Sequence, residues 1–239
     1  MIRVAIVGIG GRMGSLIAKL IDQTKDMVVV AAAEQANHPL CGQPLESSLR
    51  PQIKRLEELD LGSVDVVIDF TSPETCLQTS LLAQNSGCRL VSGTTGLSPE
   101  QLSVLRERSR HIPIVHSPNM ARGVNVFFHA VSTLSRHFGP EYGIEVVEIH
   151  HQHKKDSPSG TAKRIVDLIG RPVPCHSLRI GEVVGEHQVH VAGHGERLVL
   201  THQAETREAF ALGALLAVRF VMKQQKGLFD MWQVLDLAL

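Results

Sequence analysis

Regular alternation of two hydrophobic patterns over the first 120 residues restricts the fold of this chain most strongly. Short apolar runs rich in β-branched residues occur at 3–7, 28–33, 64–70, 89–91 and 112–115. Between them, the apolar spacing of amphipathic helices is found at 13–22, 73–85 and 98–109. Because consecutive parallel strands need crossovers that cover both faces of their sheet, this order predicts an α/β fold with a Rossmann-like, parallel-sheet nucleotide domain.

A glycine-rich segment follows the first predicted strand. The spacing of Gly8 and Gly10 allows a tight turn and a close approach of the backbone to a pyrophosphate, which would rest on the N-terminus of the next helix. The third glycine of the usual motif falls on Met13, so the spacing Gly8, Gly11, Gly14 fits equally well. A structural glycine turn is the alternative. The position between a strand and a helix favours a dinucleotide site at Gly8, Ile9, Gly10, Gly11, Arg12 and Met13.

Glu34 ends the second predicted strand, where a carboxylate can accept hydrogen bonds from the adenosine ribose hydroxyls. The same carboxylate repels a 2′-phosphate, and the next residue is Gln35, not an arginine that would offset the repulsion. NADH is therefore the favoured cofactor. Arg12, inside the glycine turn, leaves NADPH open.

Two further loops follow predicted strands, at the sheet edge where open α/β folds bind ligands. One contains Gly93, Thr94 and Thr95, and the other runs from Ser117 to Asn125. Their hydroxyls, amides and small residues suit a nicotinamide carboxamide and ribose, although ordinary turn chemistry explains each loop taken singly.

The pattern changes after Asn125. Helical spacing at 126–138 and 160–169 alternates with extended segments at 143–150, 183–191 and 197–202, and a long helix is predicted at 207–225. This part is predicted to be an inserted α+β substrate domain with a mixed sheet.

The segment from Glu148 to Ala162 holds the densest set of chemically competent side chains. Three histidines and two lysines follow an apolar strand, and a Ser-Gly-Thr turn then opens a helix. Unpaired backbone N–H groups at such a helix start can bind an anion, and imidazoles beside it can exchange protons near neutral pH. A metal site is disfavoured because no cysteine pair or second histidine pair lies nearby, and a merely solvated loop is the other alternative.

Composition excludes several classes of partner. Lysine plus arginine and aspartate plus glutamate both number 24, so the chain has no basic field for nucleic acid or for an anionic membrane. The four cysteines form no Cys-x-x-Cys pair, and the N-terminus enters a strand directly without a signal-peptide pattern. These features predict a soluble cytoplasmic protein that acts on a small ligand.

Several motifs together resemble the dihydrodipicolinate reductase family, now usually called 4-hydroxy-tetrahydrodipicolinate reductases. They cover nearly the whole chain in order, and the block from His150 to Thr161 is the most specific of them. The motifs are Val-Gly-Ile-Gly-Gly-Arg-Met-Gly at 7–14, Asp-Phe-Thr at 69–71, Gly-Thr-Thr-Gly at 93–96, Asn119 with Gly-Val-Asn at 123–125, Glu148 to Ala162, Gly-Glu-Arg-Leu at 195–198, Thr-His at 201–202 and Gly-Leu-Phe-Asp-Met at 227–231.

The resemblance implies an NAD(P)H-dependent oxidoreductase that reduces a cyclic imine dicarboxylate to tetrahydrodipicolinate on the diaminopimelate route to lysine. It implies a dinucleotide-binding domain at 1–121 and 205–239, and a substrate-binding and oligomerisation domain at 122–204. It also implies a homotetramer formed through the sheets of the substrate domains.

The resemblance further implies roles for individual residues. His150 matches the family's proposed proton donor, which would act as a cation, and Lys154 matches a lysine that binds a substrate carboxylate and is implicated in catalysis. His151, Ser159, Gly160 and Thr161 match substrate contacts. Nucleotide contacts are matched by Gly8 to Met13, Glu34, Gly93, Thr94, Thr95, Ser117, Pro118, Asn119 and Met120.

The sequence departs from the family pattern in two respects, and two alternative functions are compatible with it. The chain is short for the family, and Gln35 stands where some members carry an arginine, which puts dual cofactor use in doubt. One rival is another nicotinamide oxidoreductase, such as an amino-acid or aldehyde dehydrogenase, although an acyl-enzyme mechanism would want a cysteine and none lies within 148–162. The other is a regulator that binds NAD(H) without chemistry, which would not need the His-Lys block.

Overall fold

The computed structural model describes residues 1–237, and the chain divides into two compact units. The first unit comprises Met1–Ala121 together with the chain from Phe210 onward, and the second comprises Arg122–Ala209. The family resemblance implies a return to the first domain at 205.

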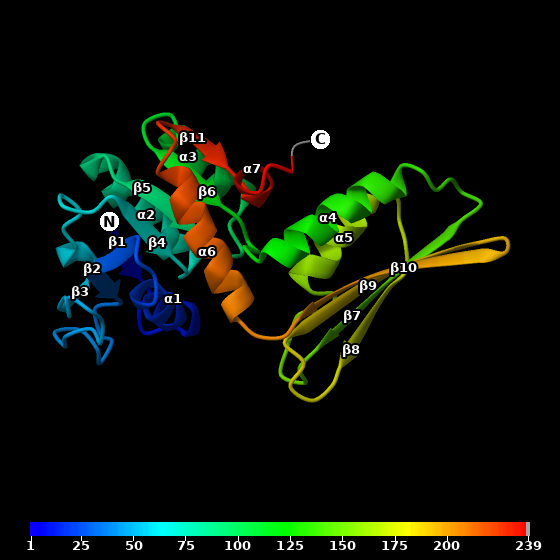
Figure 1. Ribbon diagram of the computed structural model, residues 1–239, viewed down its shortest axis with the longest axis horizontal. Coiled ribbons are helices and arrows are strands. Elements are labelled where there is room, and N and C mark those ends of the chain that lie inside the picture. The colour runs from blue at the N-terminus through cyan, green and yellow to red at the C-terminus, as the bar shows by residue number, and fades with distance from the viewer. Residues whose placement is uncertain (238–239) are drawn as a thin grey trace. The chain divides into compact units, whose positions relative to one another are not determined.

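A seven-stranded parallel sheet forms the centre of the first unit, with the strand order β11-β6-β5-β4-β1-β2-β3 (Figure 1). The Rossmann-like sheet predicted from the sequence is confirmed. Its strands are β1 (Ile2–Val7), β2 (Met27–Glu34), β3 (Ile53–Arg55), β4 (Val66–Asp69), β5 (Arg89–Ser92), β6 (Pro113–His116) and β11 (Gly227–Phe229).

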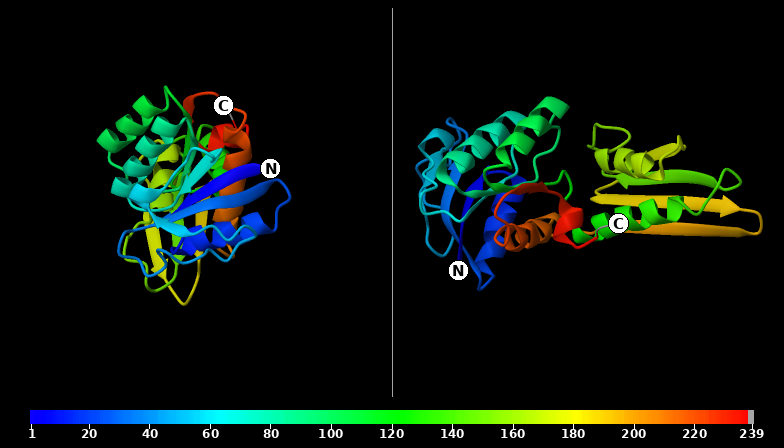
Figure 2. Two further views of the ribbon diagram at one scale, coloured as in Figure 1. Left: turned by 90° about the vertical axis from the view of Figure 1, so that its left-hand side faces the viewer. Right: turned by 90° about the horizontal axis from the view of Figure 1, so that it is seen from above.

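Helices cover both faces of this sheet (Figure 2). Successive side chains of a strand point to opposite faces, so Val4 and Ile6 of β1 pack in one core with α1 and α6, whereas Ala5 and Val7 pack in a second core with α2. Among the described residues no helix is both long and apolar enough to cross a bilayer. The helices of this unit are α1 (Arg12–Asp22), the short 3-10 helix η1 (Leu56–Glu58), α2 (Pro73–Ser86), α3 (Pro99–Arg108), α6 (Glu208–Val221) and α7 (Met231–Val234).

Local sequence signals determine where α2 and α3 begin. The hydroxyl oxygens of Ser72 and Ser98 accept hydrogen bonds from the third residue of each helix, and a proline occupies the first helical position in both. A serine at the N-cap followed by a proline at the first helical position is a typical signal for the start of a helix. The caps place the loops after β4 and β5 at the carboxyl edge of the sheet.

A four-stranded mixed sheet forms the second unit, in the order β10-β9-β7-β8. The strands β7 and β8 are parallel and the other two pairs are antiparallel, as expected for a mixed sheet. Figure 1 shows α4 and α5 side by side on one face, while the other face carries no helix of this unit. The elements are α4 (Arg122–Ser135), β7 (Gly143–His150), α5 (Gly160–Ile169), β8 (Cys175–Arg179), β9 (Gly185–Gly193) and β10 (Glu196–Ala204).

Burial alternates along β7 and places Glu148 and His150 on the same face of the sheet. The even-numbered residues from Ile144 to His150 are buried on the face covered by the helices, whereas the odd-numbered residues are more exposed. Glu148 and His150 therefore lie next to each other on the covered face. The same alternation brings His187 of β9 to that face, where only 4% of it is exposed.

Candidate active site

The glycine loop after β1 has the geometry that the glycine spacing predicts. Gly8 has a φ of +81°, a conformation that favours glycine. A Cβ on Gly14 would lie 2.2 Å from the carbonyl oxygen of Gly8, so the close approach of loop and helix requires glycine there. No side chain caps the N-terminus of α1, which leaves the N–H groups of its first turn available to an anion.

Glu34 is held directly against this loop. Its Oε2 accepts a hydrogen bond of 2.8 Å from the backbone N–H of Gly10, and its Oε1 accepts one of 3.1 Å from Gln35. The two bonds fix the carboxylate at the end of β2, where an adenosine ribose can reach it.

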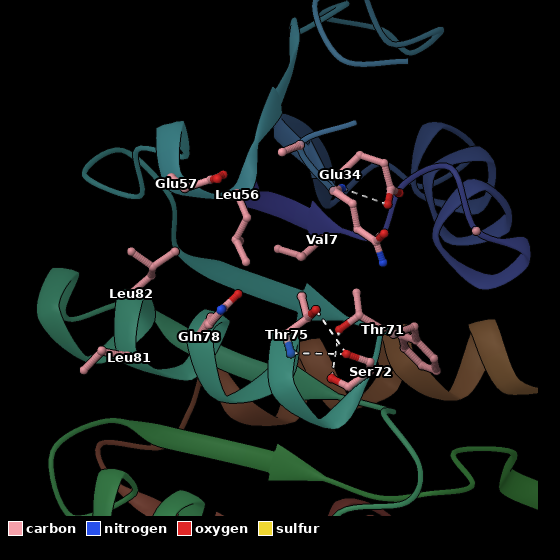
Figure 3. Close-up of a pocket in the computed structure, with 15 residues that line it drawn as sticks. Val7, Glu34, Leu56, Glu57, Thr71, Ser72, Thr75, Gln78, Leu81 and Leu82 are labelled. Carbon is pink, nitrogen blue, oxygen red and sulfur yellow. Dashed lines mark hydrogen bonds between the residues drawn. The ribbon is translucent and has the colours of Figure 1, made fainter. Parts of the chain in front are cut away.

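A pocket of about 700 Å³ opens at this carboxyl edge (Figure 3). The glycine loop after β1 and the polar residues Glu34 and Gln35 at the end of β2 lie on one side, and α2 lies on another. Leucines from η1 and α2 give the pocket apolar walls, which suit a purine ring. The lining includes Gly8, Gly11, Glu34, Gln35, Leu56, Glu57, Thr71, Ser72, Gln78, Leu81 and Leu82.

His38 was not identified as a site residue from the sequence. Its ring lies so close to the glycine loop that a Cβ on Gly10 would be 2.6 Å from its Cε1. Its Nδ1 accepts a hydrogen bond of 3.3 Å from the N–H of Leu40. No periodicity marks this position, because the segment between β2 and β3 is irregular.

Asp69 joins the loop after β4 to the predicted ligand loop after β5. Its buried Oδ1 accepts hydrogen bonds of 2.7 Å from the hydroxyls of both Thr71 and Thr94. Burial raises the pKa of Asp69 above its usual value, and these hydrogen bonds oppose the rise. The carboxyl group thereby fixes Thr94, and with it the adjoining Gly93 and Thr95, beside the end of β4.

The loop after β6 is stabilised by its own side chains. The hydroxyl of Ser117 donates to the carbonyl of Asn119 at 2.8 Å, and the Asn119 side-chain oxygen accepts from the N–H of Ala121 at 3.1 Å. Met120 is buried, and α6 approaches it so closely that a Cβ on Gly213 would lie 1.8 Å from its carbonyl oxygen. The predicted residues Ser117, Pro118, Asn119 and Met120 therefore lie on a firmly braced loop.

The second unit contains a buried cluster around His150. Nδ1 of His150 contacts Oε2 of Glu148, and the other carboxylate oxygen of Glu148 accepts a hydrogen bond of 2.8 Å from Nη2 of Arg179. The ring of His187 packs edge-on against His150, with 5.1 Å between the ring centroids. Sequence reasoning missed the contributions of Glu148, Arg179 and His187, because they depend on the register of three strands.

The start of α5 lies next to this cluster, because the N–H of Ser159 donates a hydrogen bond of 3.4 Å to Oε1 of Glu148. Ser159 is the N-cap, and its hydroxyl accepts a hydrogen bond of 3.1 Å from the N–H of Ala162. A Cβ on Gly160 would meet no heavy atom of the described residues within 4 Å outside its own helix and chain neighbours. The backbone N–H groups of Gly160 and Thr161 belong to the first turn of this helix, a place where anions can bind.

Lys154 and His151 lie on the loop between β7 and α5. The ammonium group of Lys154 is 2.8 Å from Oδ1 of Asp156, and 22% of the lysine side chain is exposed. His151 is half-buried, and its carbonyl accepts a hydrogen bond of 3.1 Å from the N–H of Lys154. By contrast, His153 is an exposed residue whose ring is 3.8 Å from Glu182.

The resemblance implies that His150 acts as a cation, but the surroundings of its ring disfavour the protonated form. Burial lowers the pKa of His150 below its usual 6.5, and the charges of Lys154 and Arg179 act in the same direction, while Glu148 opposes them. Burial also lowers the pKa of His187, to about 3, with positive charge on His150 adding to the effect. Both rings are therefore mainly neutral at pH 7 in the free protein.

Glu148 is the negative charge in this cluster. Burial by itself raises the pKa of its carboxyl group, but hydrogen bonds from Arg179 and Ser177 and the charges of His150 and Arg179 outweigh burial and hold the pKa below its usual value. Ligand atoms of Glu148, His150 and His187 come within 4.8 Å of one another. A metal ion at this set would have to compete with the guanidinium of Arg179 for the carboxylate of Glu148.

The predicted residues thus form two groups. The nucleotide candidates lie in the first unit around the carboxyl edge of the parallel sheet, and the substrate and catalytic candidates lie in the second unit around the end of β7. The first group can hold a dinucleotide, and the second can bind a carboxylate beside an imidazole.

Two family models together match nearly the whole chain. Residues 2–120 match the model of the N-terminal part of dihydrodipicolinate reductase, and residues 123–235 match that of its C-terminal part. The 4-hydroxy-tetrahydrodipicolinate reductase of Methanocaldococcus jannaschii is 37% identical over 99% of this chain and 98% of its own length. The Myxococcus xanthus protein of the same name is 38% identical over 98% of both.

A solved structure agrees with these sequence relatives. Dihydrodipicolinate reductase from Paenisporosarcina sp. TG-14, determined with dipicolinate bound, matches with a TM-score of 0.82 and 25% identity over 98% of each chain. The similarity of sequence and of fold extends over both units. The chain belongs to the dihydrodipicolinate reductase family.

Proposed function

We propose that this protein is an NAD(P)H-dependent reductase on the diaminopimelate route to lysine: 4-hydroxy-tetrahydrodipicolinate loses water to give dihydrodipicolinate, and the enzyme reduces this cyclic imine to tetrahydrodipicolinate by adding a hydride and a proton. The observation that carries the proposal is the placement of His150 beside an open helix start and a lysine, on a chain whose relatives bear that enzyme name. A nucleotide sensor would have no need of this cluster.

In the reaction, the chain's own residues position the substrate and supply a proton. A bound reduced nicotinamide supplies the hydride. The N–H groups at Gly160 and Thr161 hold one carboxylate of the substrate, and Lys154 holds the other, so the ring stays in one orientation. His150 donates a proton to the electron pair that hydride addition leaves on the conjugated ring system. The imidazole of His150 is mainly neutral at pH 7 in the free enzyme. The negative charges of a bound dianionic substrate raise the pKa of His150 and so favour the protonated ring.

Recognition of two carboxylates provides a direct binding test. Pyridine-2,6-dicarboxylate, or dipicolinate, is the molecule bound by the relative of known structure. In calorimetry with NADH present, it should bind at least about tenfold more tightly than pyridine-2-carboxylate, because one charge-assisted hydrogen bond contributes roughly 1.5 to 3 kcal/mol. Equal affinities for the two compounds would contradict the proposed carboxylate clamp.

We propose NADH as the preferred cofactor, with NADPH accepted less well. Glu34 lines the nucleotide pocket with its carboxylate fixed by Gly10, and no arginine follows it. The fixed charge accepts hydrogen bonds from a ribose diol and repels a 2′-phosphate.

Replacing Glu34 with Gln should lower the ratio of kcat/KM for NADH to kcat/KM for NADPH by about tenfold, since the loss of one hydrogen bond to a charged group is worth roughly 1.4 kcal/mol or more. Steady-state kinetics with both cofactors measures the ratio. Glu57→Gln is the control, because Glu57 is an exposed carboxylate that lines the same pocket. A ratio that changes equally in the two variants would show that only the general charge of the pocket matters.

We also propose a cytoplasmic homotetramer that forms through the uncovered face of the second sheet. Leu178 of β8 and Val199 of β10 are more than one-third exposed, which is unusual for apolar strand residues with no partner. Light scattering should give a mass of four 26.1 kDa chains, and a monomeric mass would contradict this assembly. All four cysteines are free thiols, which fits a reducing compartment.

A further inference from the structure

Glu148 occupies an unusual position for a charged residue. It is fully buried, two residues before His150 on the covered face of β7. Its Oε2 contacts Nδ1 of His150, while its Oε1 accepts hydrogen bonds from Arg179 and, at 3.4 Å, from the N–H of Ser159. One carboxylate thus contacts the imidazole, a guanidinium and the N-cap of the anion-binding helix.

Arg179 connects this carboxylate to the loop that carries Lys154. It lies on β8 directly opposite His150 in the parallel pairing. Its Nη2 donates to Glu148 Oε1 at 2.8 Å and to the carbonyl of Asp156 at 2.6 Å. Asp156 in turn contacts the Lys154 ammonium through its side chain. A single guanidinium therefore links β7, β8 and the 151–158 loop.

The opposite edge of the His150 ring packs against a glycine. A Cβ on the buried Gly185 of β9 would lie 3.1 Å from Nε2 of His150 and 3.4 Å from its Cδ2, so any larger residue there would crowd Nε2. The ring thus contacts a carboxylate at Nδ1 and a residue without a side chain at Nε2.

We propose that Glu148 and Arg179 are positioning residues for proton transfer: Glu148 accepts a hydrogen bond from Nδ1–H of His150 and so presents Nε2 to the substrate, and Arg179 holds Glu148 in place. This inference rests on the proposed function, in which His150 is the proton donor. The carboxylate fixes the orientation and tautomer of the ring and stabilises its cation, as the carboxylate partners of other acid–base histidines do. During turnover Nε2 releases its proton to the substrate and regains one from water, while Nδ1 keeps its own.

The surroundings of His150 determine the direction of the pH effect. Glu148 is the negative group at the ring, whereas Lys154 from the loop and Arg179 from β8 are positive, and His187 from β9 stays neutral. Removing the charge of Glu148 therefore leaves only interactions that disfavour the imidazolium. The pKa of His150 should fall further in a Glu148→Gln variant.

Glu148→Gln tests this inference in the full-length enzyme. We expect kcat to fall by about 10- to 100-fold, a typical cost of losing a carboxylate that orients a functional histidine. KM for NADH should stay close to the wild-type value, because Glu148 lies outside the nucleotide unit. In the wild type, kcat should fall with rising pH as the acid loses its proton. In Glu148→Gln the midpoint of this fall should move to lower pH. Glu148→Asp keeps the charge, so its midpoint should stay nearer to that of the wild type.

A measurement without turnover accompanies the kinetics. The NMR titration midpoint of the His150 ring should move to lower pH in Glu148→Gln, and fluorescence titration with NADH checks that each variant is folded. Arg179→Lys provides a second variant, because an ammonium keeps the charge but lacks the fork that reaches two oxygens, and kcat should again fall. Glu107→Gln, from an exposed pair with Arg110, should behave as wild type.

The outcomes separate the inference from the proposed function. A wild-type kcat and pH midpoint in Glu148→Gln would overturn the positioning role, as would an unchanged NMR midpoint. Equal midpoints in Glu148→Asp and Glu148→Gln would also overturn it. Failure of the wild-type enzyme to reduce the cyclic imine would instead overturn the proposed function, and the NMR comparison would still decide whether Glu148 controls His150.

Discussion

Replacement of His150 by Gln should reduce kcat by about 10²- to 10⁴-fold, the usual contribution of a correctly placed general acid. KM for the substrate should change little, because the carboxylates of the substrate are held by other groups in the proposed complex. Glutamine retains a polar side chain of similar length but cannot deliver a proton at neutral pH. Steady-state kinetics at saturating NADH measures the effect.

His153→Gln is the matched control for this experiment. His153 lies three residues further along the chain. Its ring is largely exposed and contacts the exposed Glu182 at 3.8 Å, which is long for an ion pair. The control should retain nearly all activity. Comparable losses in the two variants would show that the segment tolerates no change, and the assignment of His150 as the acid would be lost.

The pH profile of the same reaction has a predictable direction. A general acid must be protonated in the free enzyme, so kcat/KM should decrease as the pH rises through the pKa of His150. Burial and the nearby positive charges place that pKa below 6.5. His150→Gln should remove this limb of the profile.

Replacement of Lys154 by Ala should damage both binding and turnover. The ammonium group is proposed to hold one substrate carboxylate, and a hydrogen bond between charged groups contributes roughly 1.5 to 3 kcal/mol, which corresponds to about 10- to 150-fold in affinity. A ring that is held at one end only also spends less time in the reactive orientation, so kcat should fall as well. Measured KM and kcat values separate the two effects.

Asp156 complicates this site in the free enzyme, because it pairs with Lys154 at 2.8 Å. A substrate carboxylate must share the ammonium with Asp156 or displace it. Lys155→Ala is the control: it removes the same charge from an exposed neighbouring position. Loss of activity to the same extent in both variants would mean that net positive charge on the loop, and not a contact of Lys154, attracts the substrate.

Strong local signals predicted much of the framework. The bounds of β7 and α5 inferred from the sequence are those found in the structure. Apolar residues alternate along β7, and a serine N-cap marks the start of α5. The same holds for the capped starts of α2 and α3. Both sheets were also predicted with the correct class of pairing.

Short elements without a local pattern were missed. β3 and β11 contain three residues each, and β8 contains five, which is too few for a reliable periodicity. They form because a neighbouring strand offers a free edge. For example, β11 pairs with β6, which lies more than 110 residues earlier in the sequence. The sequence analysis accordingly predicts no strand at 227–231. The start of α4 was placed at Val126, four residues late.

The composition of the candidate active site was only partly visible in the sequence. His150, Lys154 and the Ser159–Thr161 turn are contiguous and form a recognisable block. The contacts of Glu148 with Arg179, and the packing of His187 on His150, depend on strands that are distant in sequence. Linear spacing contains no information about which of their side chains meet in a buried cluster.

Nicotinamide oxidation by the purified protein tests the central claim most directly. The substrate should be generated in place from pyruvate and aspartate semialdehyde by the preceding enzyme of the pathway, with NADH and NADPH assayed in parallel. We predict turnover with both cofactors and a higher kcat/KM with NADH. Binding of either nucleotide without any substrate-dependent oxidation would contradict the assignment and favour a nucleotide sensor or a different substrate.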